Sequence, residues 1–163
     1  MEKEEFVDII SKNQNLLYKI INSYCANPES RRDLEQEILL QLWKSFKRFD
    51  GSVKVTTWIY KVALNTAISH YRKDNKRIDQ PLDVDNSVFT LPDNTYDPRI
   101  DEQITILYKA IDQLSRMDKA LMLLYLDNYK QNDIADILGI SKSNVATKLY
   151  RLKNFLKKQI PNN

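Results

Sequence analysis

The chain has 163 residues, of which 42% are hydrophobic, and a formal net charge of +3 at pH 7. This length suffices for one ordinary core or two small ones, and two glycines favour an almost entirely helical protein, because sheet proteins need many more turns. A single cysteine, Cys25, excludes an internal disulfide. The sequence also has no signal peptide and no long apolar run, so we expect a cytoplasmic protein without direct membrane insertion.

The charges are distributed unevenly along the chain. Residues 1–78 carry 14 basic and 10 acidic side chains, residues 79–101 carry one and six, and residues 102–163 carry 10 and six. The middle stretch holds three of the five prolines and shows no helical periodicity, as in extended linkers. We therefore predict an all-α protein with two small helical domains, residues 1–78 and 102–163, joined by a flexible acidic linker at 79–101.

Three or more helices are predicted in the first domain. Apolar spacing indicates the first, which ends at Asn27-Pro28, through Phe6, Ile9, Ile10, Leu17, Ile20, Ile21 and Tyr24. The second opens around Ser30, and its inward face comprises Leu34, Ile38, Leu39, Leu42 and Phe46.

A mixed apolar and acidic patch is expected on the outer face of this second helix. At 100° per residue, the patch contains Asp33, Gln36, Glu37, Leu40 and Trp43. Exposed apolar side chains rimmed by acids are typical of a docking surface for a basic protein partner. The alternative is that Trp43 packs on a neighbouring helix and the carboxylates are merely solvated.

A third amphipathic helix follows the turn signal Asp50-Gly51. Its inward face is Tyr60, Ala63, Leu64, Ala67 and Tyr71. Its other side carries basic, amide and aromatic groups, namely Trp58, Lys61, Asn65, Arg72, Lys73, Lys76 and Arg77. Such a mixture suits single-stranded or partly melted nucleic acid, and a solvated cationic face is the alternative.

Residues 130–153 have the pattern of a helix-turn-helix. The first helix presents Ile134, the small Ala135 and Leu138 inward, Gly139 ends it, and Ser141 caps the next.

In the second helix of this motif, Val145, Leu149, Leu152 and Leu156 must face the core. The polar side then presents Lys142, Ser143, Asn144, Ala146, Thr147, Lys148, Tyr150, Arg151, Lys153 and Asn154, a set suited to a DNA major groove. A solvated basic surface helix is the alternative, but the small Ala135, the turn Gly139 and the absence of acids after residue 137 favour DNA.

Three segments together resemble the extracytoplasmic-function sigma factors of bacterial RNA polymerase. DLEQEILLQLW at 33–43 is similar to that family's core-polymerase-binding helix, and TWIYKVALNTAISHYRK at 57–73 to its helix for the −10 promoter element. The segment from 114 to 158 is similar to its −35-binding domain. Each match is moderately specific, whereas all three in this order make a highly specific signal.

The resemblance implies partners and roles. Core RNA polymerase would be bound through the clamp helices of its largest subunit by Asp33, Gln36, Glu37, Leu40 and Trp43, and through its flap. The non-template −10 strand would be held by Trp58, Lys61, Asn65, Arg72, Lys73, Lys76 and Arg77 with the preceding loop, and the −35 groove by Lys142, Ser143, Asn144, Thr147, Lys148, Tyr150, Arg151 and Lys153. An anti-sigma protein, often membrane-anchored in this family, is a further implied partner and would hold the chain at the membrane. No cofactor, metal or small-molecule substrate is expected.

The chain departs from the family pattern at two places, and there the family's contacts with DNA cannot be transferred to it. Family members commonly carry Lys or Arg where this chain has Ala146, so a contact with DNA is missing there and the −35 bases cannot be borrowed. The loop at 51–56, GSVKVT, is particular to this chain, which leaves the flipped −10 base unassigned.

Two other classes of protein share parts of this pattern. A helix-turn-helix regulator that does not replace the sigma subunit would share the last 45 residues but would not need the patch or the basic helix of the first domain. An enzyme is disfavoured because the chain has one histidine, His70, and no third ligand or nucleophile near Asp33 and Glu37.

Overall fold

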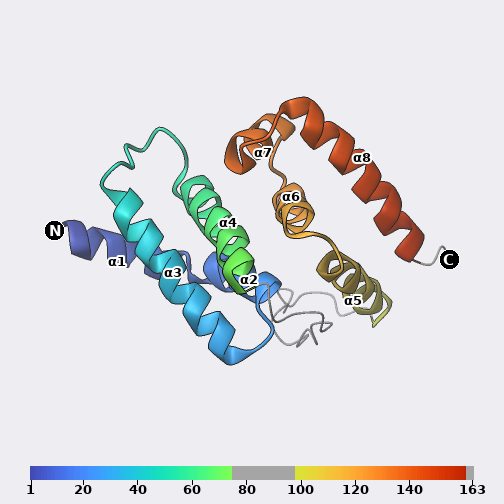
Figure 1. Ribbon diagram of the computed structural model, residues 1–163, viewed down its shortest axis with the longest axis horizontal. Coiled ribbons are helices and arrows are strands. Elements are labelled where there is room, and N and C mark those ends of the chain that lie inside the picture. Colours follow the sequence, from blue (N-terminus) through green and yellow to red (C-terminus); the bar gives the residue numbers. More distant parts are fainter. Residues whose placement is uncertain (75–97, 161–163) are drawn as a thin grey trace. The chain divides into compact units, whose positions relative to one another are not determined.

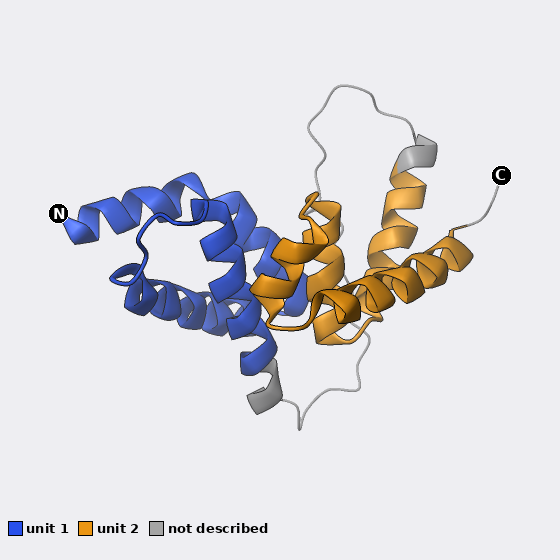
Figure 2. Ribbon diagram, turned by 90° about the horizontal axis from the view of Figure 1, so that it is seen from above, with its two compact units in different colours: residues 1–80 blue, residues 81–163 orange. Residues whose placement is uncertain are grey.

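The computed structural model describes the backbone of residues 1–74 and 98–160 and the side chains of residues 1–70 and 101–160. Every regular element in these ranges is a helix, which confirms the prediction of an all-α fold (Figure 1). The chain divides into two compact units, residues 1–80 and 81–163 (Figure 2). None of the described helices is long and apolar enough to cross a membrane.

The first unit contains α1 (Glu2–Lys12), α2 (Gln14–Tyr24), α3 (Pro28–Phe46) and α4 (Val55–Asp74). Two helices stand where the apolar spacing predicted one, because the chain leaves helical geometry at Asn13, with φ −118° and ψ 21°. The Asn13 side-chain amide donates to the Ile9 carbonyl at 2.8 Å and so competes with the helical bonding pattern. α3 begins two residues earlier than expected, since Pro28 occupies its first turn and the Asn27 side chain accepts from the Ser30 backbone N–H at 2.7 Å.

The core of the first unit lies where α2 and α3 pack on α4. Its buried side chains include Leu17, Ile20, Ile21, Leu34, Ile38, Leu42, Ile59, Tyr60, Ala63, Leu64 and Ala67. The inward face predicted for α3 is confirmed at Leu34, Ile38 and Leu42, whereas Leu39 and Phe46 are only partly buried. α1 contributes no fully buried residue, so it adds little to this core.

The second unit contains α5 (Pro98–Asp112), α6 (Arg116–Leu126), α7 (Gln131–Leu138) and α8 (Lys142–Gln159). α5 begins inside the stretch expected to be extended, and Pro98 suits a first helical position because it lacks the N–H that would be unsatisfied there. The remainder of the predicted linker lies outside the described residues. α8 packs against α5, α6 and α7 through Val145, Leu149, Leu152 and Leu156, as its periodicity predicted.

α7, its turn and α8 form the predicted helix-turn-helix (Figure 1). Gly139 ends α7 with φ 69° and ψ 34°, in the left-handed region, and Ser141 accepts from the Asn144 backbone N–H at 3.1 Å. Ala135 is 8% exposed, and its carbonyl accepts from the N–H groups of Gly139 and Ile140. The turn is therefore held by the residues on which the sequence prediction rested.

Candidate functional site

The outer face of α8 is an open polar surface of the second unit. Lys142, Ser143, Asn144, Ala146, Thr147, Tyr150, Arg151 and Asn154 are all exposed, opposite the four buried side chains. Tyr150 is 71% exposed, so its ring and hydroxyl are open to a partner. The helix thus presents hydroxyl, amide, aromatic and guanidinium groups without an acid among them.

Two lysines expected to face DNA are instead engaged within the unit. Lys148 Nζ lies 3.5 Å from Asp118 Oδ1 of α6, and its side chain is 33% exposed. Lys153 Nζ lies 4.6 Å from the centre of the Tyr125 ring, a cation–π contact. Both lysines flank the buried face rather than the centre of the open one. Either would have to leave its partner to meet a phosphate.

The patch on α3 is partly as predicted. Leu40 is 46% exposed, and Asp33 and Gln36 are exposed beside it. Trp43 is only partly exposed, because the Phe6 ring of α1 meets it edge-on at 5.1 Å between ring centres. The structure therefore supports the alternative for Trp43, packing on a neighbouring helix, while it leaves Leu40 open.

Five aromatic side chains form a continuous cluster around the end of α3 and the start of α4. They are Phe6, Trp43, Phe46, Phe49 and Trp58, with ring centres 4.8 to 6.4 Å apart between successive members. They come from α1, α3, the loop after α3 and α4, so the cluster ties together elements distant in sequence. Offset and edge-on aromatic pairs of this kind stabilise by about 0.5–1.5 kcal/mol each beyond their area burial.

The expectation that Trp58 offers an exposed ring to DNA bases is wrong. Trp58 is 7% exposed, its ring stacks on Phe49 at 4.8 Å, and its Nε1 donates to Ser45 Oγ at 3.2 Å. A helical projection places Trp58 on the polar side of α4, but the loop from α3 folds over that first turn and buries it. The cue available in the sequence was the neighbouring Phe46 and Phe49, separated from Trp58 by a short loop.

The loop between α3 and α4 is shaped by Asp50 and Gly51. The Ser52 backbone N–H donates to Asp50 Oδ1 at 2.9 Å, and Gly51 adopts φ 77°. Hydrogen bonds from the Ser52 side chain and backbone lower the pKa of the Asp50 carboxyl, so the carboxylate form holds the turn. Val53 and Lys54, which follow the turn, are exposed.

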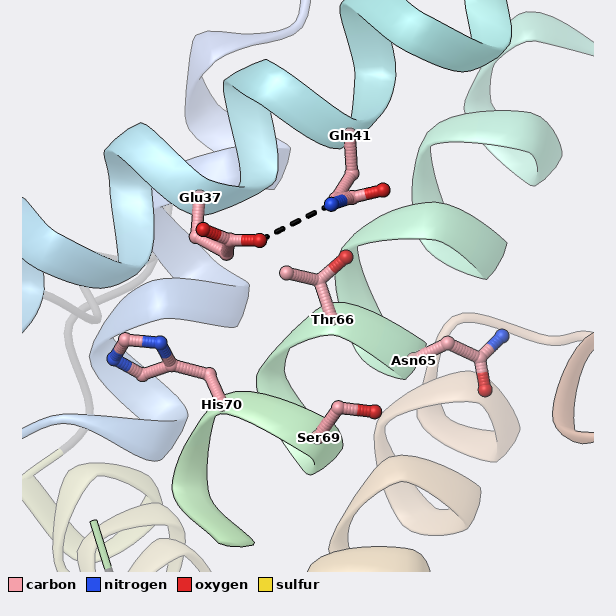
Figure 3. Close-up of a pocket in the computed structure, with 6 residues that line it drawn as sticks. All are labelled: Glu37, Gln41, Asn65, Thr66, Ser69 and His70. Atoms are coloured by element: carbon pink, nitrogen blue, oxygen red, sulfur yellow. Dashed lines mark hydrogen bonds between the residues drawn. The ribbon is translucent and has the colours of Figure 1, made fainter. Parts of the chain in front are cut away.

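A polar pocket of about 340 Å³ lies between α3 and α4 (Figure 3). Its lining comprises Glu37, Gln41, Asn65, Thr66, Ser69 and His70. Gln41 Nε2 donates to Glu37 Oε1 at 3.1 Å, and Asn65 Nδ2 donates to the Lys61 carbonyl at 2.7 Å. The pocket brings together one residue predicted to bind polymerase, Glu37, and one predicted to hold the −10 strand, Asn65.

The other residues predicted for the −10 strand are only partly placed. Lys61 is exposed on α4, one turn before Asn65. Arg72 and Lys73 belong to the last turn of α4, and their side chains lie outside the described residues. Lys76 and Arg77 lie wholly outside them. Among the residues that the structure describes, no three His, Cys, Asp or Glu side chains are grouped to hold a metal ion.

Comparisons with known proteins give the same order of segments. Residues 9–77 match the family described as Sigma-70 region 2, and residues 104–156 match the family described as Sigma-70, region 4. Of the Bacillus subtilis (strain 168) relatives, the RNA polymerase sigma factor SigV is 27% identical over 97% of this chain and 92% of its own length. The ECF RNA polymerase sigma factor SigW of the same strain is 24% identical over 98% of this chain and 90% of its own length.

The fold is also that of a solved structure. The sigma factor RpoE from Bartonella quintana, crystallised with the anti-sigma factor NepR, superposes with a TM-score of 0.68 at 17% identity. The match covers 96% of this chain and 94% of that one.

Proposed function

We propose a division of labour between the two units of this chain, which belongs to the sigma-70 family as an extracytoplasmic-function sigma factor and directs core RNA polymerase to specific promoters. The first unit docks on polymerase through α3 and holds the melted −10 strand through α4. The second unit places the outer face of α8 in the −35 major groove. The role is that of a binding and positioning factor acting in the cytoplasm, without catalysis of its own.

The observation that carries this division is the exposure of a different surface on each unit. Leu40 stands 46% exposed beside Asp33 and Gln36 on α3, which fits a basic protein partner. The face of α8 carries Arg151 and Asn144 with no acid, which fits base edges and phosphates. Neither DNA surface needs to bind tightly alone, because two sites held on one polymerase gain effective concentration.

Leu40→Ala is the sharpest test of the docking surface. Trp43 packs against Phe6, so its removal would also disturb the fold, whereas Leu40 is exposed. Fully burying an exposed leucine side chain contributes about 1.5–3 kcal/mol, and Leu40 is 46% exposed, so covering the rest contributes about half of this and we expect core polymerase to bind the variant about three- to tenfold more weakly. Leu126→Ala is the matched control, since Leu126 is 37% exposed in the other unit. Equal core binding by the Leu40 and Leu126 variants would contradict this placement.

The −10 role is tested separately from docking. Lys61→Ala and Asn65→Ala should reduce promoter opening, measured by the chemical reactivity of unpaired thymines in the promoter bubble. Binding to core polymerase should stay at the wild-type level. Lys109→Ala removes an exposed lysine from α5 and serves as the control. If the Lys61 and Asn65 variants open promoters as well as the Lys109 variant does, the assignment of α4 to the melted strand fails.

We also propose an anti-sigma partner that covers these same surfaces. The support is the solved sigma factor crystallised with an anti-sigma factor, together with the exposed apolar Leu40 beside Asp33 and Gln36. Such a partner, membrane-anchored or not, should compete with core polymerase for the wild-type chain and bind the Leu40→Ala variant less tightly. Simultaneous binding of both partners would refute the shared surface.

A further inference from the structure

Two methyl groups are exposed in the first turns of α8. Ala146 and Thr147 are exposed neighbours, and Tyr150 lies three to four residues further along the same side of the helix. In helix-turn-helix proteins, the N-terminal residues of the second helix contact base edges. These side chains therefore occupy positions where direct reading of sequence takes place.

Hydrogen bonds at the start of α8 engage two of the three hydroxyl protons near these methyl groups. Thr147 Oγ1 donates to the Ser143 carbonyl at 3.0 Å, so Thr147 offers a partner its methyl and an acceptor lone pair but no donor. The Ser143 and Ser141 hydroxyls lie 3.3 Å apart and share a hydrogen bond, while Ser141 also accepts from the Asn144 N–H. This part of the face is consequently less polar than its residue names suggest.

We propose that Ala146 and Thr147 select thymine in the −35 element by van der Waals contact with its 5-methyl group. In the major groove that methyl group is the one apolar feature of a base pair, and alanine and the threonine methyl are suited to meet it. Ala146 ends at Cβ, so it lets the helix approach the base edges closely where a long cationic side chain would reach for phosphate. The inference rests on the proposed function and gives this chain's Ala146 a role of its own.

The test replaces thymine by uracil, which differs from it only by the methyl group. Duplexes randomised over the upstream element are first selected with the full chain bound to core polymerase. In the best duplex, each thymine is then changed singly to deoxyuridine, and holoenzyme binding is measured by competition. We expect two positions, one for each methyl group, to lose about fourfold in affinity each, the effect of burying about one methyl or methylene group, while the other positions change little.

Two variants assign the effect to named side chains. Thr147→Ser removes the methyl and keeps the hydroxyl that bonds to Ser143, so it should bind thymine and deoxyuridine equally at one sensitive position. Thr105→Ser is the matched control, because Thr105 Oγ1 makes the same bond to the Asp101 carbonyl at 2.8 Å in α5. Ala146→Lys should lose the sensitivity at the other position and steepen the salt dependence of log K by about 1.

The outcomes are distinguishable. Selection of a specific duplex with no sensitivity to deoxyuridine at any position would overturn the inference and leave the proposed function standing. Sensitivity that persists in both the Thr147→Ser and Ala146→Lys variants would overturn it as well. A loss of core binding in the Thr147→Ser variant would mean that the methyl groups meet polymerase instead of DNA. Failure of the holoenzyme to select any duplex would refute the proposed function itself.

Discussion

Replacement of Gly139 by alanine should weaken the second unit alone and by a predictable amount. Gly139 has φ 69°, and a Cβ built on it meets no atom within 4 Å, so the substitution costs backbone strain and nothing else. An L-residue in the left-handed region costs about 1–2 kcal/mol, and the stiffer unfolded chain returns part of this. We expect a net loss of about 1 kcal/mol in the free energy of unfolding, or about 4–8 °C in Tm for a domain of this size.

Two spectroscopic signals distinguish the unfolding of the two units. Both tryptophans, Trp43 and Trp58, belong to the first unit, so their fluorescence follows that unit, whereas far-ultraviolet circular dichroism follows the helices of both. Gly139→Ala should lower the Tm of the transition seen by circular dichroism and leave the Tm of the fluorescence transition unchanged. Gly51→Ala is the mirror experiment, since Gly51 has φ 77°, nothing lies within 4 Å of its Cβ position, and it should lower the fluorescence transition.

Asparagine provides the discriminating control. It tolerates the left-handed region better than alanine, so Gly139→Asn should cost less than Gly139→Ala. If the two variants melt together, or if Gly139→Ala melts like the wild type, strain at φ 69° is not what the glycine relieves. If both transitions shift equally, the two units do not unfold independently.

Three further outcomes are expected. Asp118→Asn should release Lys148, tighten DNA binding and steepen the salt dependence of log K by about 1, whereas Lys148→Ala in the wild-type background should change that dependence little; binding titrations at several salt concentrations decide this. Hydrogen bonding lowers the pKa of Asp50, so its stabilising contribution is lost as the pH falls below about 4. Burial raises the pKa of Asp112, offset in part by its partner Lys119, so its contribution is instead lost as the pH rises. The difference in the free energy of unfolding between the wild type and each Asp→Asn variant, measured by urea unfolding, should therefore change with pH in opposite directions for Asp50 and Asp112. Phe6→Ala should speed amide hydrogen exchange in α1 but not in α2, α3 or α4, because that ring ties α1 to the aromatic cluster and α1 buries no residue of its own.

The parts of the fold that sequence predicted well are governed by local physics. The period of Val145, Leu149, Leu152 and Leu156 located the buried face of α8, because a single helix packed on one core must bury one stripe. Gly139 and Ser141 fixed the turn, because a left-handed end and a side-chain cap each depend on one residue. No distant contact was needed for either prediction.

Two side chains whose surroundings the sequence did not show, Lys148 and Trp58, contact partners outside their own helix. Lys148 is separated from Asp118 by 30 positions, so spacing along α8 could not show the ion pair. Trp58 is buried by a loop that a projection of α4 alone does not contain. Asn13 split an expected helix through one side-chain bond that periodicity does not register. Exposure of a side chain is a tertiary property, and a single helix predicts it only where no neighbour closes over.

The burial of Trp58 would link the two tasks proposed for the first unit. Its Nε1 bond to Ser45 joins the start of α4 to the end of α3, and seven residues later, two turns along the same side, stands Asn65. A polymerase docked on α3 would then hold α4 through this junction and set the position of the −10 site.

Trp58→Phe tests the link, because it keeps a ring in the cluster but removes the donor to Ser45. A hydrogen bond contributes about 1 kcal/mol net, so we expect promoter opening to fall by up to about fivefold while affinity for core polymerase stays unchanged. Ser45→Ala removes the acceptor from the other helix and should have the same effect, with no additional loss in the double variant. If opening survives in both single variants, α4 is positioned by its core packing alone, and the junction between Trp58 and Ser45 serves only stability.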